Sequence, residues 1–204
     1  RLSTQLLTTT STVSRSTGRC SISPSRNSTL AKPSRAALAR ARAIIAAVNG
    51  HAYGGGLETA LCCDFIYAVR GAKLALSELR LGIMPGGAGT QNLPRAVGER
   101  RAKELILTAR AFSAEEGAGW GLVNKVCEPG KTLSDALETA QQIAANAPIA
   151  VRQAKKSVHY GLQMDLLTGY RYEIEAYNRL VDTEDRREGV RAFNEKRKPV
   201  FKGR

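Results

Sequence analysis

Residues 44–78 read IIAAVNGHAYGGGLETALCCDFIYAVRGAKLALSE, and this stretch decides the fold class. Residues 43–48 are small or β-branched apolar residues, which is typical of a strand that is buried on both faces. Asn49 and Gly50 then form a turn signal, and three consecutive glycines lead into a helical pattern. A strand, a glycine turn and a helix in this order predict an α/β core.

Two carboxylates follow the glycines in largely apolar surroundings. Glu58 falls in the first turn of the expected helix, and Glu78 lies further on between Leu76 and Leu79. A carboxylate in such a setting is rarely buried without a partner and can act as a general acid or base. We therefore treat both as candidate catalytic residues that could position a water and protonate the far end of a double bond. The alternative for Glu58 is a solvated acid at a helix start.

Two glycine-rich segments are candidate anion sites. Gly54, Gly55 and Gly56 precede a helix, whose first N–H groups could face a phosphate or the oxyanion of a carbonyl or thioester. Their spacing is not that of a dinucleotide-binding fingerprint, and no P-loop lysine follows. Residues 85–91 read PGGAGTQ and could form an anion nest, or simply a loop that leads into a helix.

The rest of the chain alternates strands and helices before it becomes helical throughout. Strands are expected at residues 64–69, 73–76 and 122–127. Helices are expected at residues 55–63, 88–97, 99–109, 113–119, 132–145, 148–160, 165–181 and 184–196. Ser113 and Glu116 form the pattern of a capping box, and Asp182 or Thr183 could cap the last helix. This order predicts an α/β core at residues 43–130 and a helical region at residues 131–204.

Residues 1–42 differ in composition from the rest. They are rich in Ser, Thr and Arg, contain no acid and offer few large apolar residues, so we expect a disordered segment. The same composition is typical of a transit peptide. A transit peptide predicts a mitochondrial matrix protein, and the alternative is a cytoplasmic protein whose first residues are artefactual. The chain starts with Arg1 rather than Met.

The distribution of charge, the cysteine spacing and the lengths of the apolar runs argue against a metal site and a membrane span. The net charge is +13, but eight of the cations lie before Glu58, where no acid occurs. The remainder is modestly basic, which suits an anionic ligand. The four cysteines show no metal-ligand spacing, His51 and His159 have no partners at such spacing, and we expect no metal site. No apolar run reaches the roughly 18 residues that span a bilayer.

Four blocks resemble the enoyl-CoA hydratase/isomerase, or crotonase, superfamily. They are residues 44–68 (IIAAVNGHAYGGGLETALCCDFIYA), 75–98 (ALSELRLGIMPGGAGTQNLPRAVG), 102–126 (AKELILTARAFSAEEGAGWGLVNKV) and 182–204 (DTEDRREGVRAFNEKRKPVFKGR). The similarity covers residues 43–204. It implies a spiral of ββα units followed by a helical region that forms trimers, which often pair into hexamers.

The resemblance also implies roles for single residues. The backbone N–H of Gly55 matches one donor of the thioester oxyanion hole, and Glu58 and Glu78 match the two acids that hold a water in the hydratases. The implied reaction is syn addition of water to a 2-trans-enoyl-CoA, in fatty-acid or branched-chain amino-acid breakdown. It needs no metal or redox cofactor, since coenzyme A is part of the substrate. Further substrate contacts are expected from Gly54, Gly56, Pro85, Gly86, Phe201 and Lys202.

The sequence departs from the family pattern before residue 43. The family places further ββα units there, which supply the second oxyanion donor, and residues 1–42 do not match them. Loss of one such donor costs about 10²–10³ in rate, so we expect impaired activity. Without the strands of these units, we also expect an exposed strand edge.

Two alternatives for the function stay open. One is another crotonase chemistry, such as enoyl-CoA isomerisation or methylglutaconyl-CoA hydration. The other is a non-catalytic RNA-binding relative that uses the basic N-terminal arm.

Overall fold

A computed structural model describes residues 4–8 and 43–204. The strands are β1 (Thr4–Thr8), β2 (Ile44–Val48), β3 (Ala52–Tyr53), β4 (Phe65–Val69), β5 (Lys73–Ala75), β6 (Phe112–Ser113) and β7 (Lys125–Cys127). The helices are α2 (Gly55–Leu61), α3 (Gly89–Val97), α4 (Glu99–Thr108), α5 (Ala114–Gly119), α6 (Thr132–Ala144), α7 (Pro148–Gly161), α8 (Leu166–Val181) and α9 (Glu184–Asn194), with a 3-10 helix η1 (Glu78–Leu81).

The chain alternates between two small sheets. One sheet has the order β1-β2-β4-β7 and the other has the order β3-β5-β6. The first strand of each ββα unit joins the first sheet and the second strand joins the other, so β2 pairs with β4, and β3 with β5, both in parallel. This arrangement confirms the α/β core that the sequence predicts.

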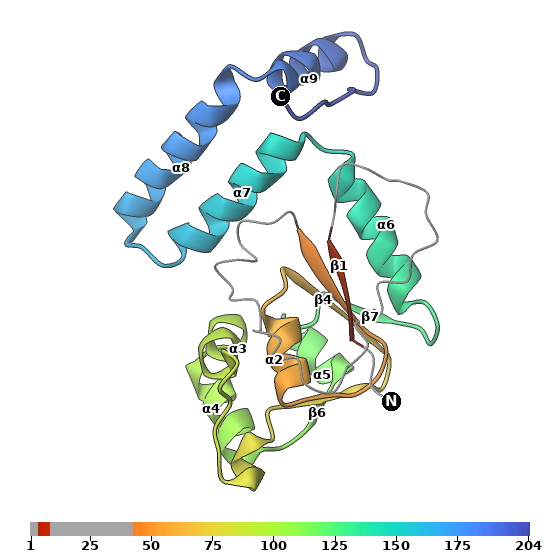
Figure 1. Cartoon of the computed structure of the whole chain (residues 1–204), viewed down its shortest axis with the longest axis vertical. Helices are drawn as coiled ribbons and strands as arrows, with labels where there is room; N and C mark the ends of the chain where they lie inside the picture. The colour runs from red at the N-terminus through yellow and green to blue at the C-terminus, as the bar shows by residue number, and fades with distance from the viewer. Residues whose placement is uncertain (1–3, 9–42) are drawn as a thin grey trace, which may run out of the picture.

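Strand β2 is buried on both faces, as its apolar sequence predicts. Ala46 and Val48 belong to the main core cluster, which also receives Leu57 from α2. Ile45 and Ala47 point the opposite way into a second cluster beneath α6. Figure 1 shows the sheet between α6 on one side and α2 and α5 on the other. The strand therefore fixes the position of the glycine turn that follows it.

The prediction of disorder for residues 1–42 is wrong at Thr4–Thr8. These residues form β1, which pairs antiparallel with β2 from Thr4 opposite Val48 to Thr8 opposite Ile44. Strand β1 thus covers the edge of β2, whereas β3 pairs only with β5 among the described strands, and the expected exposed strand edge lies there. The physical reason for the pairing of β1 is that an open strand edge offers unpaired N–H and C=O groups, and a segment rich in threonine and leucine adopts the extended backbone that pairs with them. The remainder of residues 1–42 lies outside the described residues.

Two local differences from the predicted elements occur in the core. The strand expected at residues 122–127 begins only at Lys125, because the N–H groups of Leu122 and Val123 both donate to the Gly117 carbonyl and close the end of α5. The sequence also gave no indication of η1, which begins at Glu78. Helix η1 matters for the site, since it sets the direction of the Glu78 side chain.

The C-terminal region is helical, as predicted, and side-chain caps occur at the starts of α5, α8 and α9. The Ser113 hydroxyl and the Glu116 carboxylate form a capping box at α5. Asp165 caps α8 and Thr183, rather than Asp182, caps α9. Pro148 occupies the first turn of α7. Figure 1 shows α7, α8 and α9 extending away from the sheets.

The C-terminal tail folds back onto the start of α9. The buried Asp185 carboxylate accepts N–H groups from Lys202 at 2.6 Å and Gly203 at 2.8 Å, and its own N–H donates to the Arg204 carbonyl at 3.1 Å. Buried carboxylates need such partners because an unpaired buried charge is costly. The tail is thus anchored to its own helix.

Acid should release part of this tail. The Glu188 carboxylate accepts two bonds from Arg197, at 2.6 and 3.0 Å, and the Val200 N–H at 2.9 Å. The Arg197 guanidinium, helped by Val200, lowers the pKa of Glu188 from 4.5 to about 2. Because the pKa of Glu188 is lower in the folded chain than in the unfolded chain, its ionised form stabilises the tail at any pH above the unfolded pKa. This stabilisation is lost as the pH falls through the folded pKa. We expect hydrogen-exchange protection of Val200 to be lost between pH 4.5 and about 2.

Exchange measured residue by residue and corrected for the intrinsic pH dependence checks this prediction. Helix α6 serves as the internal reference for global unfolding. Glu188→Gln should already show weak protection of Val200 at neutral pH, with no further change on acidification. Protection of Val200 in the parent chain that persists at pH 1 while α6 stays folded would contradict the prediction.

Candidate active site

The glycine turn after β3 brings the backbone of α2 against the side chain of Glu78. Gly54 has φ +53°, a conformation that suits glycine. Its N–H donates to the Ala75 carbonyl at 2.9 Å, and its carbonyl accepts the Glu58 N–H at 3.0 Å. A Cβ built on Gly54 would lie 3.1 Å from Glu78 Oε1. Gly54 therefore lies against the Glu78 carboxylate and accepts a helical hydrogen bond from the backbone of Glu58.

Gly55 is the first residue of α2, and Gly56 is the second. The first N–H groups of an α-helix have no acceptor within the helix, so they are available to an acceptor outside it. The nearest atom to a Cβ built on Gly56 is the Ala52 Cβ at 4.0 Å. Gly56 thus packs on β3, while Gly55 begins the helix next to the turn.

Glu58 is buried, with 2% of its surface exposed. Its Oε1 accepts the N–H of Gly87 at 2.5 Å and the N–H of Gly89 at 3.0 Å. Ala88, between them, has φ +81°, and this left-handed residue turns both flanking N–H groups toward one point, as in an anion nest. The loop at residues 85–91 is therefore a nest whose anion is Glu58, and the alternative of a solvated Glu58 is wrong.

Gly89 is enclosed on three sides. A Cβ built there would lie 2.9 Å from Leu76 Cδ1, 3.0 Å from the Pro85 Cβ and 3.1 Å from Glu58 Oε1. Pro85 is buried. Leu76 lies between the end of β5 and Glu78, so Gly89 contacts the start of its own loop, the segment that leads to Glu78 and the Glu58 carboxylate. The sequence named this loop as a candidate nest, but it gave no signal that Gly87 and Gly89 would hold Glu58.

Glu78 begins η1, and its side chain is half-buried. Its Oε2 is buried and has no hydrogen-bond partner among the described residues. Buried polar atoms are almost always paired, so an unpaired carboxylate oxygen marks an atom that awaits a water or a ligand. Glu78 Oε1 borders Gly54, and the Glu58 carboxylate borders Gly89 beside Leu76, two residues before Glu78, so both predicted acids lie on segments that surround the glycine turn.

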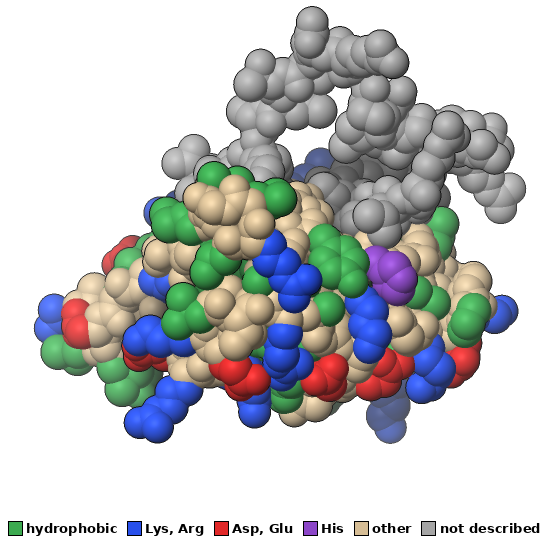
Figure 2. All heavy atoms as spheres, turned by 90° about the horizontal axis from the view of Figure 1, so that it is seen from below, with side chains coloured by type: hydrophobic (Ala, Val, Ile, Leu, Met, Phe, Trp, Pro, Cys, Tyr) green, Lys and Arg blue, Asp and Glu red, His purple; other side chains and the backbone are tan. Residues whose placement is uncertain are grey.

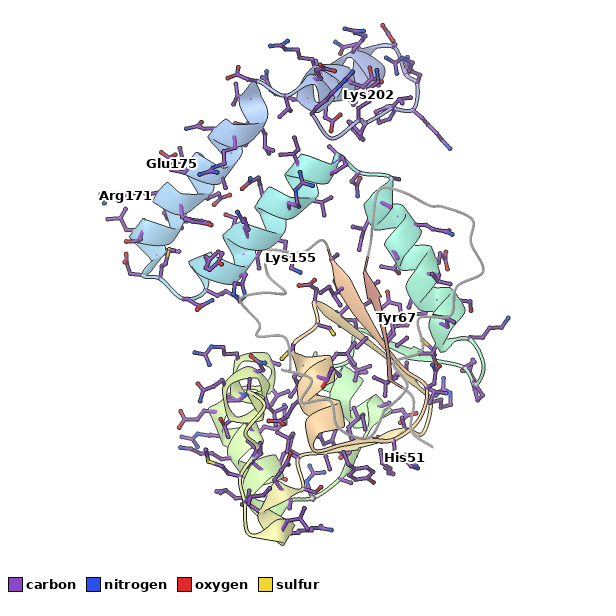
Figure 3. The ribbon with its side chains drawn as sticks, in the orientation of Figure 1. His51, Tyr67, Lys155, Arg171, Glu175 and Lys202 are labelled. Atoms are coloured by element: carbon purple, nitrogen blue, oxygen red, sulfur yellow. The ribbon has the colours of Figure 1, made fainter. Side chains whose placement is uncertain are left out.

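The predicted contacts from the C-terminal tail lie elsewhere in this chain. Phe201 packs against Gly189, with 3.6 Å between its Cε1 and a Cβ built on that glycine, and the Lys202 backbone is held by Asp185. Figure 3 shows Lys202 at the α9 end of the molecule, far along its long axis from α2. Gly86 is exposed on the nest loop. A substrate contact from Phe201 or Lys202 of another copy stays a prediction.

Two cavities lie near the site without including its acids. One, of about 550 Å³, is lined by residues of α3 and α7, among them Asn92 and His159. The other, of about 530 Å³, lies between β4 and α7, where Lys155 pairs with Asp64 at 2.7 Å. Neither is lined by Glu58 or Glu78.

Cysteine and histidine side chains in the described part of the chain have structural roles. Burial raises the pKa of the Cys63 thiol to about 12, so it stays protonated and unreactive. His51 accepts the Lys73 N–H through Nδ1 at 2.9 Å. No group of three or more His, Cys, Asp or Glu in residues 4–8 and 43–204 could hold a metal ion. No described helix is long and apolar enough to cross a membrane.

Figure 2 shows the face of the molecule seen from below. Lysine and arginine side chains alternate there with aspartate and glutamate, and apolar side chains lie among them. A nucleic-acid footprint usually appears as a continuous basic stripe, and this face does not have one.

Comparison with known proteins assigns the family. The family model described as enoyl-CoA hydratase/isomerase matches residues 25–204. The chain belongs to this family. YngF of Bacillus subtilis, named as an enoyl-CoA hydratase/isomerase, is 51% identical over 160 residues, covering 78% of this chain and 62% of YngF. The mitochondrial methylglutaconyl-CoA hydratase of Homo sapiens is 44% identical over 163 residues, covering 78% of this chain and 48% of that protein.

A solved structure of the same kind confirms the fold. The crystal structure of an enoyl-CoA hydratase from Bacillus anthracis superposes with a TM-score of 0.77 at 50% identity, over 78% of this chain and 62% of that one. The crotonase-type fold predicted from the four sequence blocks is therefore confirmed. The chain spans between about half and three-fifths of the length of these relatives.

Proposed function

We propose that the protein is an enoyl-CoA hydratase that adds water to 2-trans-enoyl-CoA thioesters. The observation that carries the proposal is the pair of acids around the glycine turn, Glu58 on α2 and Glu78 at the start of η1. Glu58 is fixed by two N–H donors, and Glu78 keeps a buried oxygen without a hydrogen-bond partner among the described residues. Such a pair can hold one water between a rigid acceptor and an unpaired one. Names of relatives that contain "enoyl-CoA hydratase" support the assignment.

In the proposed mechanism, the thioester carbonyl accepts the Gly55 N–H at the start of α2. One carboxylate takes a proton from the water as its oxygen bonds to C3. The electrons of the double bond move to the carbonyl oxygen, where the N–H stabilises the developing charge. The other acid, protonated, gives its proton to C2 from the same face, which restores the carbonyl. The proton balance closes within the pair, so the proposed reaction needs no metal or redox cofactor.

The presence of both acids favours hydration over the alternative of double-bond isomerisation. Isomerisation moves one proton within the substrate and needs a single acid–base group, whereas hydration must also activate a water. Glu78 Oε1 borders Gly54 and the Glu58 carboxylate borders Gly89, so the proposed site offers the second group that hydration requires. Product analysis separates the two reactions, since only hydration yields a 3-hydroxyacyl-CoA.

Hydration of crotonyl-CoA, followed by the loss of ultraviolet absorbance of the conjugated thioester, tests the proposed function. The parent chain and the exposed-site control Glu175→Gln on α8 should turn over at the same rate, while Glu58→Gln should lose turnover. Figure 3 shows Glu175 on the C-terminal helices, away from the glycine turn. Isomerised products, or equal rates for the parent and Glu58→Gln, would contradict the proposal. A panel of other enoyl-CoAs, methylglutaconyl-CoA among them, identifies the preferred acyl group.

We also propose a homotrimer or hexamer that forms through the C-terminal helices. Large apolar side chains lie exposed along α8 and α9: Leu166, Leu167, Tyr170, Ile174, Tyr177, Val190 and Phe193. Exposed apolar side chains that gather along two neighbouring helices are typical of an interface. Light scattering should give three or six times the chain mass, and a monomeric mass would contradict the proposal.

We propose a mitochondrial matrix location on the composition of residues 1–42. This segment has seven arginines and no acid, and import sequences share this bias. The human relative carries the word mitochondrial in its name. Residues 1–42 fused to a fluorescent protein should direct it to mitochondria, and replacing the arginines with glutamine should abolish import. Diffuse cytoplasmic fluorescence of the arginine-containing fusion would contradict the proposal.

A further inference from the structure

A groove of about 520 Å³ lies between α7 and α8, and none of its lining residues belongs to the proposed active site. Its volume falls within the roughly 300–1,000 Å³ of small-molecule sites. We call it the α7–α8 groove. It is lined by Arg152, Gln153, Lys156, Tyr160, Met164 and Tyr172.

The charge of the groove is positive and uncompensated. Arg152 and Lys156 lie one helical turn apart, so they share one face of α7, and both are half-buried. Like charges at this spacing repel each other. Neither forms an ion pair with any described residue, and no carboxylate lines the groove. The adjacent Lys155, by contrast, pairs with Asp64 at 2.7 Å. An anion between the two cations would remove the repulsion.

The other end of the groove is aromatic. Tyr160 from α7 and Tyr172 from α8 have ring centroids 5.9 Å apart and planes inclined at 60°. Both rings are half-buried, so part of each remains open to a ligand. Aromatic side chains stack on nucleic-acid bases, and the Gln153 amide can both donate to and accept from a base edge. The groove therefore suits a molecule with an anionic part and a flat aromatic part.

We propose that the α7–α8 groove binds a purine nucleoside monophosphate, with the phosphate on the two cations and the base against the two tyrosines. Arginine and lysine are the usual partners of phosphate oxygens. The proposal does not rest on the proposed hydratase activity, because no groove residue adjoins Glu58 or Glu78. Two sources supply this chemistry, a free nucleotide such as AMP and the nucleotide end of a larger molecule such as coenzyme A.

Isothermal titration of the chain with AMP, inorganic phosphate and adenosine tests the proposal. AMP should bind with one site per chain, and phosphate and adenosine each at least about tenfold more weakly, since each lacks half of the contacts. Binding of AMP should weaken with salt, because charge screening acts on partly exposed cations. AMP that does not bind at millimolar concentration, or adenosine that binds equally well, would overturn the proposal.

Substitutions of groove residues test whether AMP binds in the α7–α8 groove. Arg152→Ala and Lys156→Ala should each weaken AMP binding by about tenfold or more, as expected for a lost charge-assisted hydrogen bond. Tyr160→Leu should weaken AMP without changing phosphate binding. Arg171→Ala is the matched control, since this exposed residue does not line the groove and Figure 3 shows it on the outer side of α8. AMP binding that survives both cation variants would overturn the proposal.

Competition distinguishes the two sources of the nucleotide. Coenzyme A that displaces AMP, and whose own binding weakens in Arg152→Ala, identifies a coenzyme A thioester as the source. AMP binding that coenzyme A leaves unchanged identifies a free nucleotide. Both results uphold the proposed site and are measured without an activity assay.

Discussion

Glu78→Gln is expected to lower kcat for crotonyl-CoA hydration by about 10²–10⁴, the range that general acid–base catalysis contributes. The amide keeps the shape of the side chain but can neither take up nor release a proton. The loss should appear in kcat with little change in KM. Oε2 of Glu78 forms no hydrogen bond with the described residues, so its replacement should leave the folded structure around the substrate unchanged.

Stopped-flow kinetics and thermal melts check this prediction together. The melting temperature of Glu78→Gln should stay within a few degrees of the parent value. Glu175→Gln, on the exposed surface of α8, controls for loss of one negative charge. A Glu78→Gln variant that hydrates crotonyl-CoA at more than a tenth of the parent rate would rule out Glu78 as an acid–base group.

Gly89→Ala is expected to damage both stability and activity. The new methyl group would lie 2.9 Å from Leu76 Cδ1 and 3.1 Å from Glu58 Oε1. Overpacking of this kind costs about 1–3 kcal/mol, which for a chain of this size lowers the melting temperature by about 2–4 °C per kcal/mol. Since the displaced carboxylate loses its alignment with the two N–H donors, we also expect kcat to fall by at least tenfold.

Gly119→Ala is the matched control. A Cβ built on Gly119 meets nothing within 4 Å, so this substitution should leave the melting temperature and kcat close to the parent values. Equal melting temperatures for Gly89→Ala and the parent, together with unchanged kcat, would show that the nest loop does not constrain Glu58.

Local signals in the sequence predicted the elements well. The apolar run of β2, the capping box at Ser113 and the cap at Thr183 depend on neighbours a few residues away, so local sequence is enough to predict them. These features place the helices within one or two residues of their observed ends. They also place Glu58 in the first turn of α2.

Contacts between distant segments could not be read from such signals. Glu58 meets Gly87 and Gly89 about thirty residues away only because α2 and α3 pack together. Asp185 meets Lys202 through the return of the tail, and Thr4–Thr8 pairs with β2 across the whole of residues 9–43. Composition indicated disorder for β1 because it does not report an unpaired strand edge elsewhere in the chain. The sequence named Glu58 and Glu78 as candidates, but it did not reveal what holds the Glu58 side chain in place.

In the proposed mechanism, Glu58 and Glu78 act as one unit on one water. A double-mutant cycle in kcat for crotonyl-CoA hydration, with Glu58→Gln, Glu78→Gln and the double variant, tests it most directly. Because residues that act as a unit are strongly non-additive, the double variant should be no more than about tenfold slower than the slower single variant. A double variant whose loss equals the product of the two single losses would show that the two carboxylates act independently, and the shared water would then be ruled out.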